Sequence, residues 1–258
     1  MCTPPDDSGQ PAPPAVAEDE RRLRTNDGAS LREFIVQPAT GFRRGAVVII
    51  HDIWGYTDFY KNLARRITGH GHAAALVDFF GRQGDLPETI RNPERSGRTP
   101  EAYALARQRA EQLTDERFLA DMQTAIDDLQ ARGAQRVACW GFCLGGRLAY
   151  VSAARVRSLA GVVAYYGFLQ GEPGRLSPLE LAGEIRVPVL GIFGGADPVI
   201  PADQVSAFRD GLKTDNQIVV YPDAPHGFLR FGAADHKAAV EDALSRTFRF
   251  LSRVLTPS

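Results

Sequence analysis

A thiol, a carboxylate and an imidazole occur along the chain in an order that suits nucleophilic catalysis. Cys143 lies in "GFCLGG" (141–146), Asp197 in "GIFGGADPVIP" (191–201) and His226 in "VVYPDAPHGF" (219–228). A thiol of ordinary pKa, about 8.5, is only a few per cent thiolate at neutral pH, so it needs a base and a group that orients the base. Asp197 and His226 follow apolar runs typical of strands, where such partners are expected.

The surroundings of Cys143 predict a sharp turn between a strand and a helix. "RVACW" (136–140) is typical of a buried strand, and "LGGRLAYVSAARV" (144–156) begins as a helix of small residues. Gly141 and Gly145 leave room for such a turn, and the helix N-terminus favours a thiolate at Cys143. The alternative is a buried structural cysteine, which is common for free thiols. We assign that role to Cys139, in the middle of the strand.

Short apolar runs alternate with helical patterns along most of the chain. The apolar runs cover 45–52, 73–80, 136–142, 160–167, 187–195 and 216–223. The helical patterns cover about 58–69, 100–130 with a break near Leu113, 145–157, 201–213 and 234–254. Strand and helix in alternation predict an α/β fold, with a mostly parallel sheet covered by helices on both faces. The stretch "SLREFIVQP" (30–38) is typical of an added edge strand.

Length and composition predict one domain. The chain has 258 residues, of which 44% are apolar and 24% charged, and we expect a disordered lead-in over 1–22 and an α/β domain over 23–258. A net charge of -1 gives no electrostatic footprint for nucleic acid or an anionic membrane. With no apolar run of about 18 residues, no secretory pattern and an odd count of cysteines, we expect a cytoplasmic location.

Six motifs together carry a family resemblance. The stretches "HDIWG", "DFFGRQ", "GFCLGG", "AYYG", "GGADPVIP" and "PHGFLR" resemble the dienelactone hydrolase family, the cysteine members of the α/β-hydrolase fold, over roughly 30–255. The resemblance implies a triad in which Cys143 is the nucleophile, His226 the base and then the acid, and Asp197 the group that orients His226. It also implies an oxyanion hole formed by the backbone N–H groups of Leu144 and Ile53.

The same resemblance implies roles for residues that surround the substrate. Arg82 and Arg230 occupy the positions that bind a substrate carboxylate, for which the planar guanidinium is suited; the alternative is a pair of surface arginines. Tyr166 matches a pocket tyrosine, with a core role as the alternative. Asp52 departs from the pattern, because the family usually has a glutamate there that contacts the resting thiol and helps to activate it. Its shorter side chain leaves that catalytic role open.

The expected function is hydrolysis of a lactone or ester, with a carboxylate-bearing dienelactone as substrate and an acyl-thioester as intermediate. No cofactor and no metal are implied, and the expected partner is a small molecule, with the chain a monomer or small homo-oligomer. One alternative is a general carboxylesterase or thioesterase of the same fold, and another is a non-catalytic redox or binding protein that uses the thiol. The segment 81–99 is either an active-site loop or a surface excursion.

Overall fold

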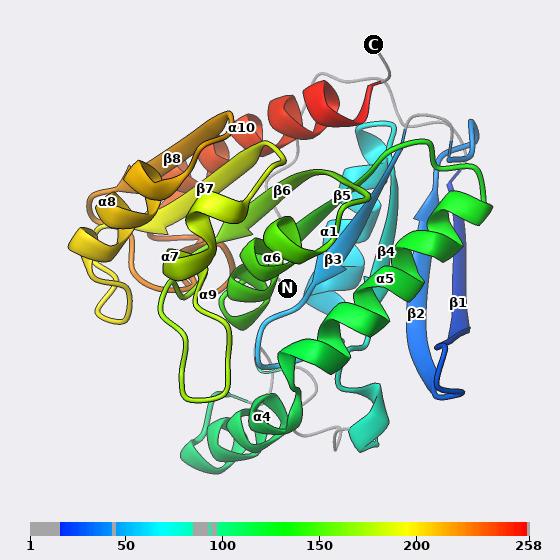
Figure 1. Cartoon of the computed structure of the whole chain (residues 1–258), viewed down its shortest axis with the longest axis horizontal. Helices are drawn as coiled ribbons and strands as arrows, with labels where there is room; N and C mark the ends of the chain where they lie inside the picture. Colours follow the sequence, from blue (N-terminus) through cyan, green and yellow to red (C-terminus); the bar gives the residue numbers. More distant parts are fainter. Residues whose placement is uncertain (1–15, 43–44, 85–92, 94–96, 257–258) are drawn as a thin grey trace.

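A computed structural model describes residues 16–42, 45–84, 93 and 97–256. Within these residues the centre of the molecule is an eight-stranded sheet with the order β1-β2-β4-β3-β5-β6-β7-β8 (Figure 1). The β1/β2 and β2/β4 pairs are antiparallel, and every other neighbouring pair is parallel. The predicted α/β fold with a mostly parallel sheet is confirmed.

The strands and helices follow one another as the sequence pattern indicated. The strands are β1 (Ala17–Arg24), β2 (Ser30–Gln37), β3 (Ala46–Ile50), β4 (Ala73–Val77), β5 (Val137–Phe142), β6 (Leu159–Tyr165), β7 (Val189–Gly194) and β8 (Asn216–Tyr221). The helices are α1 (Asp58–Gly69), α4 (Pro100–Gln112), α5 (Asp115–Ala131), α6 (Leu144–Arg155), α7 (Pro178–Leu181), α8 (Ala202–Gly211), α9 (Phe228–Phe231) and α10 (Lys237–Leu255), with short 3₁₀ turns η1 (Gly81–Gln83) and η2 (Ala182–Glu184).

The strand order reverses beside β3. From β3 the chain passes to β4 on one side of it, and β5 later pairs with its other side. In open parallel sheets, ligands bind beyond the carboxyl ends of the strands at such a reversal. The residues that follow β3 and β5 therefore stand where the topology favours a site.

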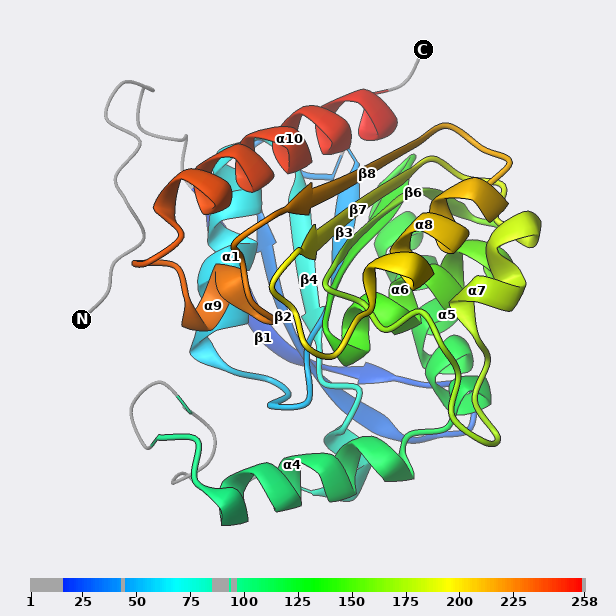
Figure 2. The same ribbon diagram turned by 90° about the vertical axis from the view of Figure 1, so that its left-hand side faces the viewer.

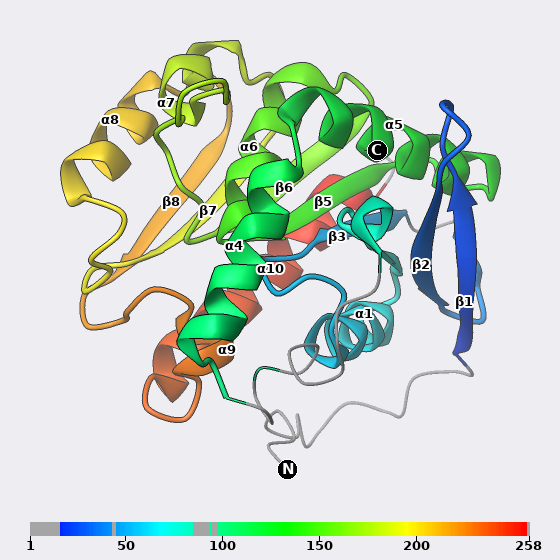
Figure 3. The ribbon, with the colours of Figure 1, turned by 90° about the horizontal axis from the view of Figure 1, so that it is seen from below.

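Helices cover both faces of the sheet. Contacts with the strands place α1 and α10 on one face and α5, α6 and α8 on the other (Figure 2). Helix α4 lies outside these two layers, and Figure 3 shows it crossing in front of the sheet when the molecule is seen from below. Trp54, which follows β3, packs against Ala102 and Ala106 of α4. Helix α4 thus lies near the carboxyl ends of the strands.

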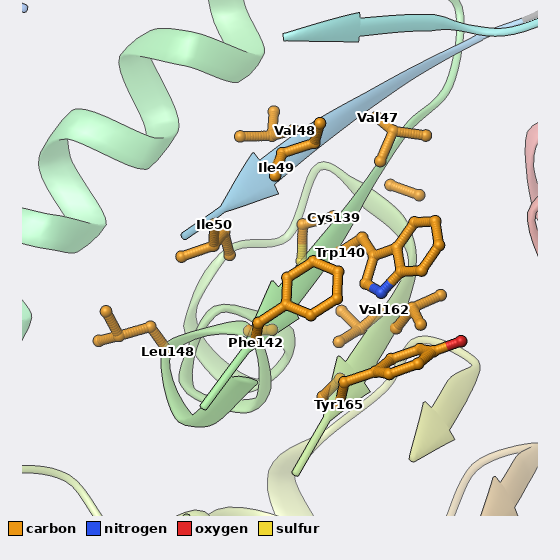
Figure 4. Packing of buried hydrophobic residues seen from close by; sticks show 14 of the residues in the cluster. Val47, Val48, Ile49, Ile50, Cys139, Trp140, Phe142, Leu148, Val162 and Tyr165 are labelled. Atoms are coloured by element: carbon orange, nitrogen blue, oxygen red, sulfur yellow. The ribbon is translucent and has the colours of Figure 1, made fainter. Parts of the chain in front are cut away.

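The central strands are apolar along their whole length because helices bury them on both sides. Every residue of β3, β4 and β5 is buried. Figure 4 shows Val47 to Ile50 of β3 beside Cys139, Trp140 and Phe142 of β5. The Trp140 ring stacks on Phe142, with 5.4 Å between ring centroids. Continuous apolar runs of this kind are what a doubly covered parallel sheet requires.

Strand β1 differs from the sequence expectation. Residues 17–22 of this strand fall within the segment 1–22 that we expected to be a disordered lead-in, while residues 1–15 lie outside the described part of the chain. Its composition is highly charged, but several of these charges are paired with distant residues: Glu18 with Arg65 of α1, and Arg21 with Asp128 of α5. Backbone hydrogen bonds to β2 also hold β1 in the sheet. The stretch 30–38, which we expected at the edge, is therefore the second strand, and β1 is the edge strand.

The break expected near Leu113 separates α4 from α5. Helix α4 ends at Gln112, and the hydroxyl of Thr114 caps α5 by accepting from the N–H of Arg117 at 3.3 Å. The guanidinium of Arg175 donates to the carbonyls of Leu113 and Ala110, both at 2.9 Å, and so satisfies the C-terminal end of α4.

Two other expectations concern loops and membranes. Of the segment 81–99, the structure describes only η1, Gly84, Pro93 and residues 97–99, so the prediction of an active-site loop there lies largely outside the described residues. In the described part of the chain, none of the helices combines the length and the apolar character needed to cross a membrane.

Candidate active site

Cys143 stands on a strained turn between β5 and α6. Its φ is 55° and its ψ is −115°, and together with Tyr166, at φ 39°, it is one of the two non-glycine residues with positive φ in the described chain. Such backbone costs about 1–3 kcal/mol and persists where surrounding contacts fix it. One such contact is the N–H of Cys143, which donates to the carbonyl of Tyr165 at 3.0 Å.

The glycines around Cys143 are required by close backbone contacts. A Cβ at Gly145 would lie 2.2 Å from the carbonyl oxygen of Ile50 and 2.5 Å from that of His51. A Cβ at Gly141 would lie 2.0 Å from the carbonyl oxygen of Gly145. The start of α6 therefore lies directly against the end of β3, and the two glycines leave the room that the sequence analysis expected of them.

The surroundings of Cys143 disfavour its thiolate form. Burial raises its pKa well above the ordinary value, and the nearby charges of Asp52 and Asp197 raise it further, against the lowering effect of the Leu144 N–H on the sulfur. Burial also raises the pKa of Cys139, which is fully enclosed in β5. The two thiols differ in access, because Cys143 is partly exposed while Cys139 is buried.

Asp197 holds the imidazole of His226. The Oδ2 of Asp197 lies 2.7 Å from Nδ1 of His226, and its Oδ1 accepts from the N–H of Val199 at 2.8 Å. The rings of Phe168 and Tyr166 pack on the imidazole, with centroids at 5.6 and 5.1 Å. The carboxylate therefore fixes the Nδ1–H tautomer, which leaves Nε2 of His226 able to accept a proton.

Two backbone N–H groups near Cys143 take no part in the backbone hydrogen bonding of the fold. The N–H of Leu144, at the first position of α6, and the N–H of Ile53, after β3, donate to no backbone carbonyl in the part of the chain that the structure describes. The N–H of Leu144 donates a hydrogen bond to the Cys143 sulfur. Donors that the backbone does not use, next to the sulfur that would attack, are what an oxyanion hole needs.

Asp52 and Arg230 form a buried ion pair. The Nη1 of Arg230 donates to Oδ2 of Asp52 at 2.8 Å, and the Nη2 of Arg230 donates to the hydroxyl of Thr57 at 3.2 Å. The two side chains are only 7% and 1% exposed, so any ligand that binds Arg230 must compete with Asp52. The Arg230 guanidinium also lies over the rings of Phe59 and Tyr60, 5.0 and 5.3 Å from their centroids.

Arg82 is paired with acidic residues away from Cys143. Its guanidinium binds Asp121 of α5 at 2.5 Å, Asp27 of the β1–β2 turn at 2.8 Å, and the hydroxyl of Thr25 at 3.2 Å. These two carboxylates raise the pKa of Arg82. The recorded contacts join Arg82 to the β1–β2 hairpin and α5 rather than to the group around Cys143. Its predicted role in binding a substrate carboxylate stays a prediction.

Tyr166 belongs to the group around Cys143. It follows β6, and the charge of Asp52, the Cys143 thiol and above all burial raise the pKa of its phenol. Its N–H donates to the carbonyl of Ile192 at 2.7 Å. The structure thus brings together, at the carboxyl ends of β3, β5, β6, β7 and β8, these predicted site residues: Asp52, Ile53, Cys143, Leu144, Tyr166, Asp197, His226 and Arg230.

Sequence reasoning missed several residues that shape this site. Thr57 and Tyr60 contact Arg230, and Phe168 packs flat against His226 with an interplanar angle of 12°. Thr57 directly precedes α1, where a threonine is expected for capping, so nothing in the sequence marked it as a partner of Arg230.

No group of three or more His, Cys, Asp or Glu side chains in the described ranges could hold a metal ion.

The fold and the strained turn define an α/β-hydrolase, with candidate catalytic side chains in the order that this class uses. Residues 31–255 match the model of the dienelactone hydrolase family, and the chain belongs to that family. It is therefore a hydrolase that acts on esters or lactones.

Individual proteins support the same assignment. A carboxymethylenebutenolidase of Rhodococcus opacus is 32% identical over 223 residues, which cover 81% of each chain. A Saccharolobus solfataricus protein named "Putative carboxymethylenebutenolidase" is 31% identical over 261 residues, covering 89% of this chain and 96% of its own. A solved structure from Klebsiella pneumoniae, named "Putative Dienelactone Hydrolase", superposes with a TM-score of 0.80 at 28% identity and covers 92% of this chain and 99% of its own.

Proposed function

We propose that the protein hydrolyses its ester or lactone through covalent catalysis by Cys143, with His226 as the general base and acid and Asp197 as the residue that orients His226. The single observation that carries the proposal is the hydrogen bond of 2.7 Å between Asp197 and Nδ1 of His226, at the sheet edge where Cys143 stands on its strained turn. Nucleophilic catalysis by a thiol requires a base whose orientation is fixed, and Asp197 fixes the His226 imidazole in this way.

The reaction proceeds in two halves. Nε2 of His226 takes the proton of the Cys143 thiol as the sulfur attacks the carbonyl carbon, and the carbonyl oxygen becomes an oxyanion held by the N–H groups of Leu144 and Ile53. The C–O bond to the leaving oxygen then breaks, and that oxygen takes the proton from His226. Water, deprotonated by His226, next attacks the thioester, and Cys143 leaves with the proton returned to its sulfur.

The neutral resting thiol restricts the class of substrate. Because burial and the charge of Asp52 raise the pKa of Cys143, the thiolate forms only as His226 accepts its proton. A thiolate is itself easily expelled from a tetrahedral intermediate, so the substrate needs a leaving group at least as good. Enol esters and enol lactones meet this requirement, and amides do not.

A carboxylate on the substrate would have to compete for Arg230. The guanidinium is already paired with Asp52 and 1% exposed, so a carboxylate-bearing dienelactone would bind by displacing Asp52 from it. Arg82 is paired with Asp121 and Asp27. The family resemblance supports a carboxylate-bearing dienelactone. The internal pairing of both arginines favours a second candidate, a neutral ester or lactone that needs neither of them.

The test compares two substrates and two proteins. Wild type and Cys143→Ala are assayed with a dienelactone that bears a free carboxylate and with p-nitrophenyl acetate, which is uncharged. Turnover of the dienelactone that is lost in Cys143→Ala supports the triad and the first candidate. Turnover of p-nitrophenyl acetate alone, again lost in the variant, supports the triad and the second candidate. Turnover that survives the loss of Cys143 contradicts the triad.

A further inference from the structure

Every polar atom of Asp52 makes a hydrogen bond, and one of its carboxylate oxygens closes a turn around Ile53. Oδ1 accepts from the N–H of Trp54, two residues on, at 2.9 Å, while Oδ2 accepts from Arg230. Its N–H donates to the hydroxyl of Tyr60 at 3.0 Å, and its carbonyl accepts from Nδ1 of His51 at 2.8 Å. The peptide of Ile53, whose N–H donates to no backbone carbonyl in the described chain, is therefore held inside a turn that the Asp52 side chain closes.

The same two-sided arrangement occurs at two other strand ends. Asp197, after β7, accepts from Val199 with Oδ1 and from His226 with Oδ2. Asp78, after β4, accepts from the N–H of Phe80 at 3.2 Å and from Arg32 at 2.7 Å. In each case one oxygen fixes the backbone two residues on, and the other holds a side chain from a distant element. The arrangement at Asp52 is thus a recurrent way in which this chain fixes a loop after a strand.

We infer that Asp52 is a positioning residue that sets the direction of the Ile53 N–H toward the oxyanion, and that it does not take the proton of the Cys143 thiol. The inference rests on the proposed function, because it assigns the geometry of that oxyanion hole. Both carboxylate oxygens are already committed, to Trp54 and to Arg230. To accept a proton, Asp52 would have to leave a buried arginine or open the turn, and either change is costly.

The length of the side chain explains why aspartate stands here. An aspartate oxygen reaches the N–H two residues on in a compact Asx-turn, and an asparagine oxygen does the same. Glutamate carries one more methylene, so its carboxylate reaches past that N–H. The family resemblance assigns contact with the thiol to a glutamate at this position. The shorter aspartate instead bonds the backbone and so makes the loop that contains Ile53 rigid. The nearby packing of Trp54 on α4 adds to that rigidity.

The decisive experiment separates the turn from the charge. Asp52→Asn and Asp52→Ala are each combined with Arg230→Met, so that the buried arginine loses its charge together with its partner. Both double variants then lack the charge of Asp52, and the asparagine variant alone keeps a side-chain acceptor for the Trp54 N–H. Rates are measured with p-nitrophenyl acetate, which carries no carboxylate, and the matched parent is the single variant Arg230→Met. Circular dichroism and thermal unfolding establish that each variant is folded.

We expect kcat for the asparagine double variant to stay within about tenfold of Arg230→Met, and kcat for the alanine double variant to fall about a hundredfold, as when an oxyanion donor is lost. The single variant Asp52→Glu, which keeps the charge, should lose kcat by a similar factor against wild type. The inference is overturned if kcat falls equally in the two double variants. It is also overturned if Asp52→Glu loses a smaller factor in kcat against wild type than the asparagine double variant loses against Arg230→Met. Either result would make Asp52 a base. Cys143→Ala in the same assay tests the triad separately. Turnover that survives in this variant contradicts the proposed function but leaves the turn closed by Asp52 unaffected.

A second measurement does not depend on turnover. Hydrogen exchange of the Trp54 amide, followed by NMR or by mass spectrometry of a peptide spanning 51–56, reports the turn directly. The amide should exchange at least about tenfold faster in the alanine double variant than in the asparagine double variant, because one has lost the acceptor. Equal exchange in the two overturns the inference even for a protein that turns over neither substrate.

Discussion

His226 and Arg230 lie four residues apart on the connection between β8 and α10, and each is held by an aspartate from a different strand end. Asp197 binds His226 at 2.7 Å and Asp52 binds Arg230 at 2.8 Å. One connection thus joins the ends of β7 and β3, which lie on opposite sides of β5 and of Cys143. Changes at either aspartate should therefore affect both the imidazole and the loop that contains Ile53.

The reactivity of Cys143 toward alkylation should depend on pH in a characteristic way. Because its pKa is raised, the thiolate is scarce at neutral pH and grows as pH rises beyond the ordinary thiol range near 8.5. At pH 8 the rate with iodoacetamide should be at least about tenfold below that of a peptide thiol, and it should still be rising at pH 10. Cys143→Ser identifies the labelled residue, and Cys139→Ser is the matched control. A rate that levels off below pH 8 would show a thiolate already formed at rest.

Glu33 should make the protein less stable as pH rises toward neutrality. The side chain is fully buried beside Arg21 and Asp128, and burial raises its pKa from 4.5 to about 7. The folded state therefore holds the proton more tightly than the unfolded state. Its contribution to the free energy of unfolding is complete below about pH 4.5 and is lost as pH rises to about 7, by roughly 3 kcal/mol in all.

Urea unfolding of wild type and Glu33→Gln at pH 5 and pH 8 measures this effect. The glutamine variant should show a smaller fall in the free energy of unfolding between the two pH values, because the amide has no proton to lose. The control is Glu20→Gln on β1, where Glu20 is half exposed and paired with Lys61. An unchanged fall in Glu33→Gln would mean that Glu33 is ionised in the folded protein.

Arg82 should contribute to stability through Asp121. The Asp121 side chain is 1% exposed, so Arg82→Gln leaves a buried carboxylate without its cation and should lower the free energy of unfolding by about 3 kcal/mol. Asp27→Asn, which removes only the exposed partner in the β1–β2 turn, should have a small effect. Denaturant unfolding provides the comparison. A rise in KM for carboxylate-bearing substrates without loss of stability would instead support the predicted role of Arg82 in binding substrate.

Gly145→Ala should prevent normal folding of the turn at Cys143. An added Cβ would meet the carbonyl oxygens of Ile50 and His51 at 2.2 and 2.5 Å, and backbone atoms of a central strand have little freedom to move. The control is Gly69→Ala at the end of α1, where an added Cβ meets nothing within 4 Å; this change should be neutral or stabilise by up to about 1 kcal/mol. Soluble yield and Tm report both, and a normal Tm for Gly145→Ala would refute the tight contact.

The sequence predicted the fold well because its signals are local. Buried parallel strands appear as continuous apolar runs, and the break between α4 and α5 is marked by Leu113 and the capping Thr114. Strand β1 was missed because its composition alone is typical of disorder, and the side chains that neutralise it, such as Arg65 and Asp128, lie far away in the chain.

The candidate site was predictable in its residue types and less so in its contacts. The turn at Cys143 and the positions of Asp197 and His226 follow from motifs, because strand ends of a parallel sheet meet at one edge. The partners of the arginines do not follow from motifs. Asp121 is one of several acidic residues on an amphipathic helix, and the pairing of Asp52 with Arg230 joins residues 178 positions apart. Only the packed structure decides which carboxylate meets which guanidinium.

The most direct test of the mechanism is to trap the acyl group on the protein. Wild type is mixed with p-nitrophenyl acetate and quenched in acid at a series of times during turnover, and the modified peptide is found by mass spectrometry. The mechanism predicts one acetyl group on Cys143, released by neutral hydroxylamine as a thioester, and none in Cys143→Ala. Turnover by wild type with no acetyl group on Cys143 at any quench time, or an acetyl group on another residue that forms at the rate of turnover, would contradict it.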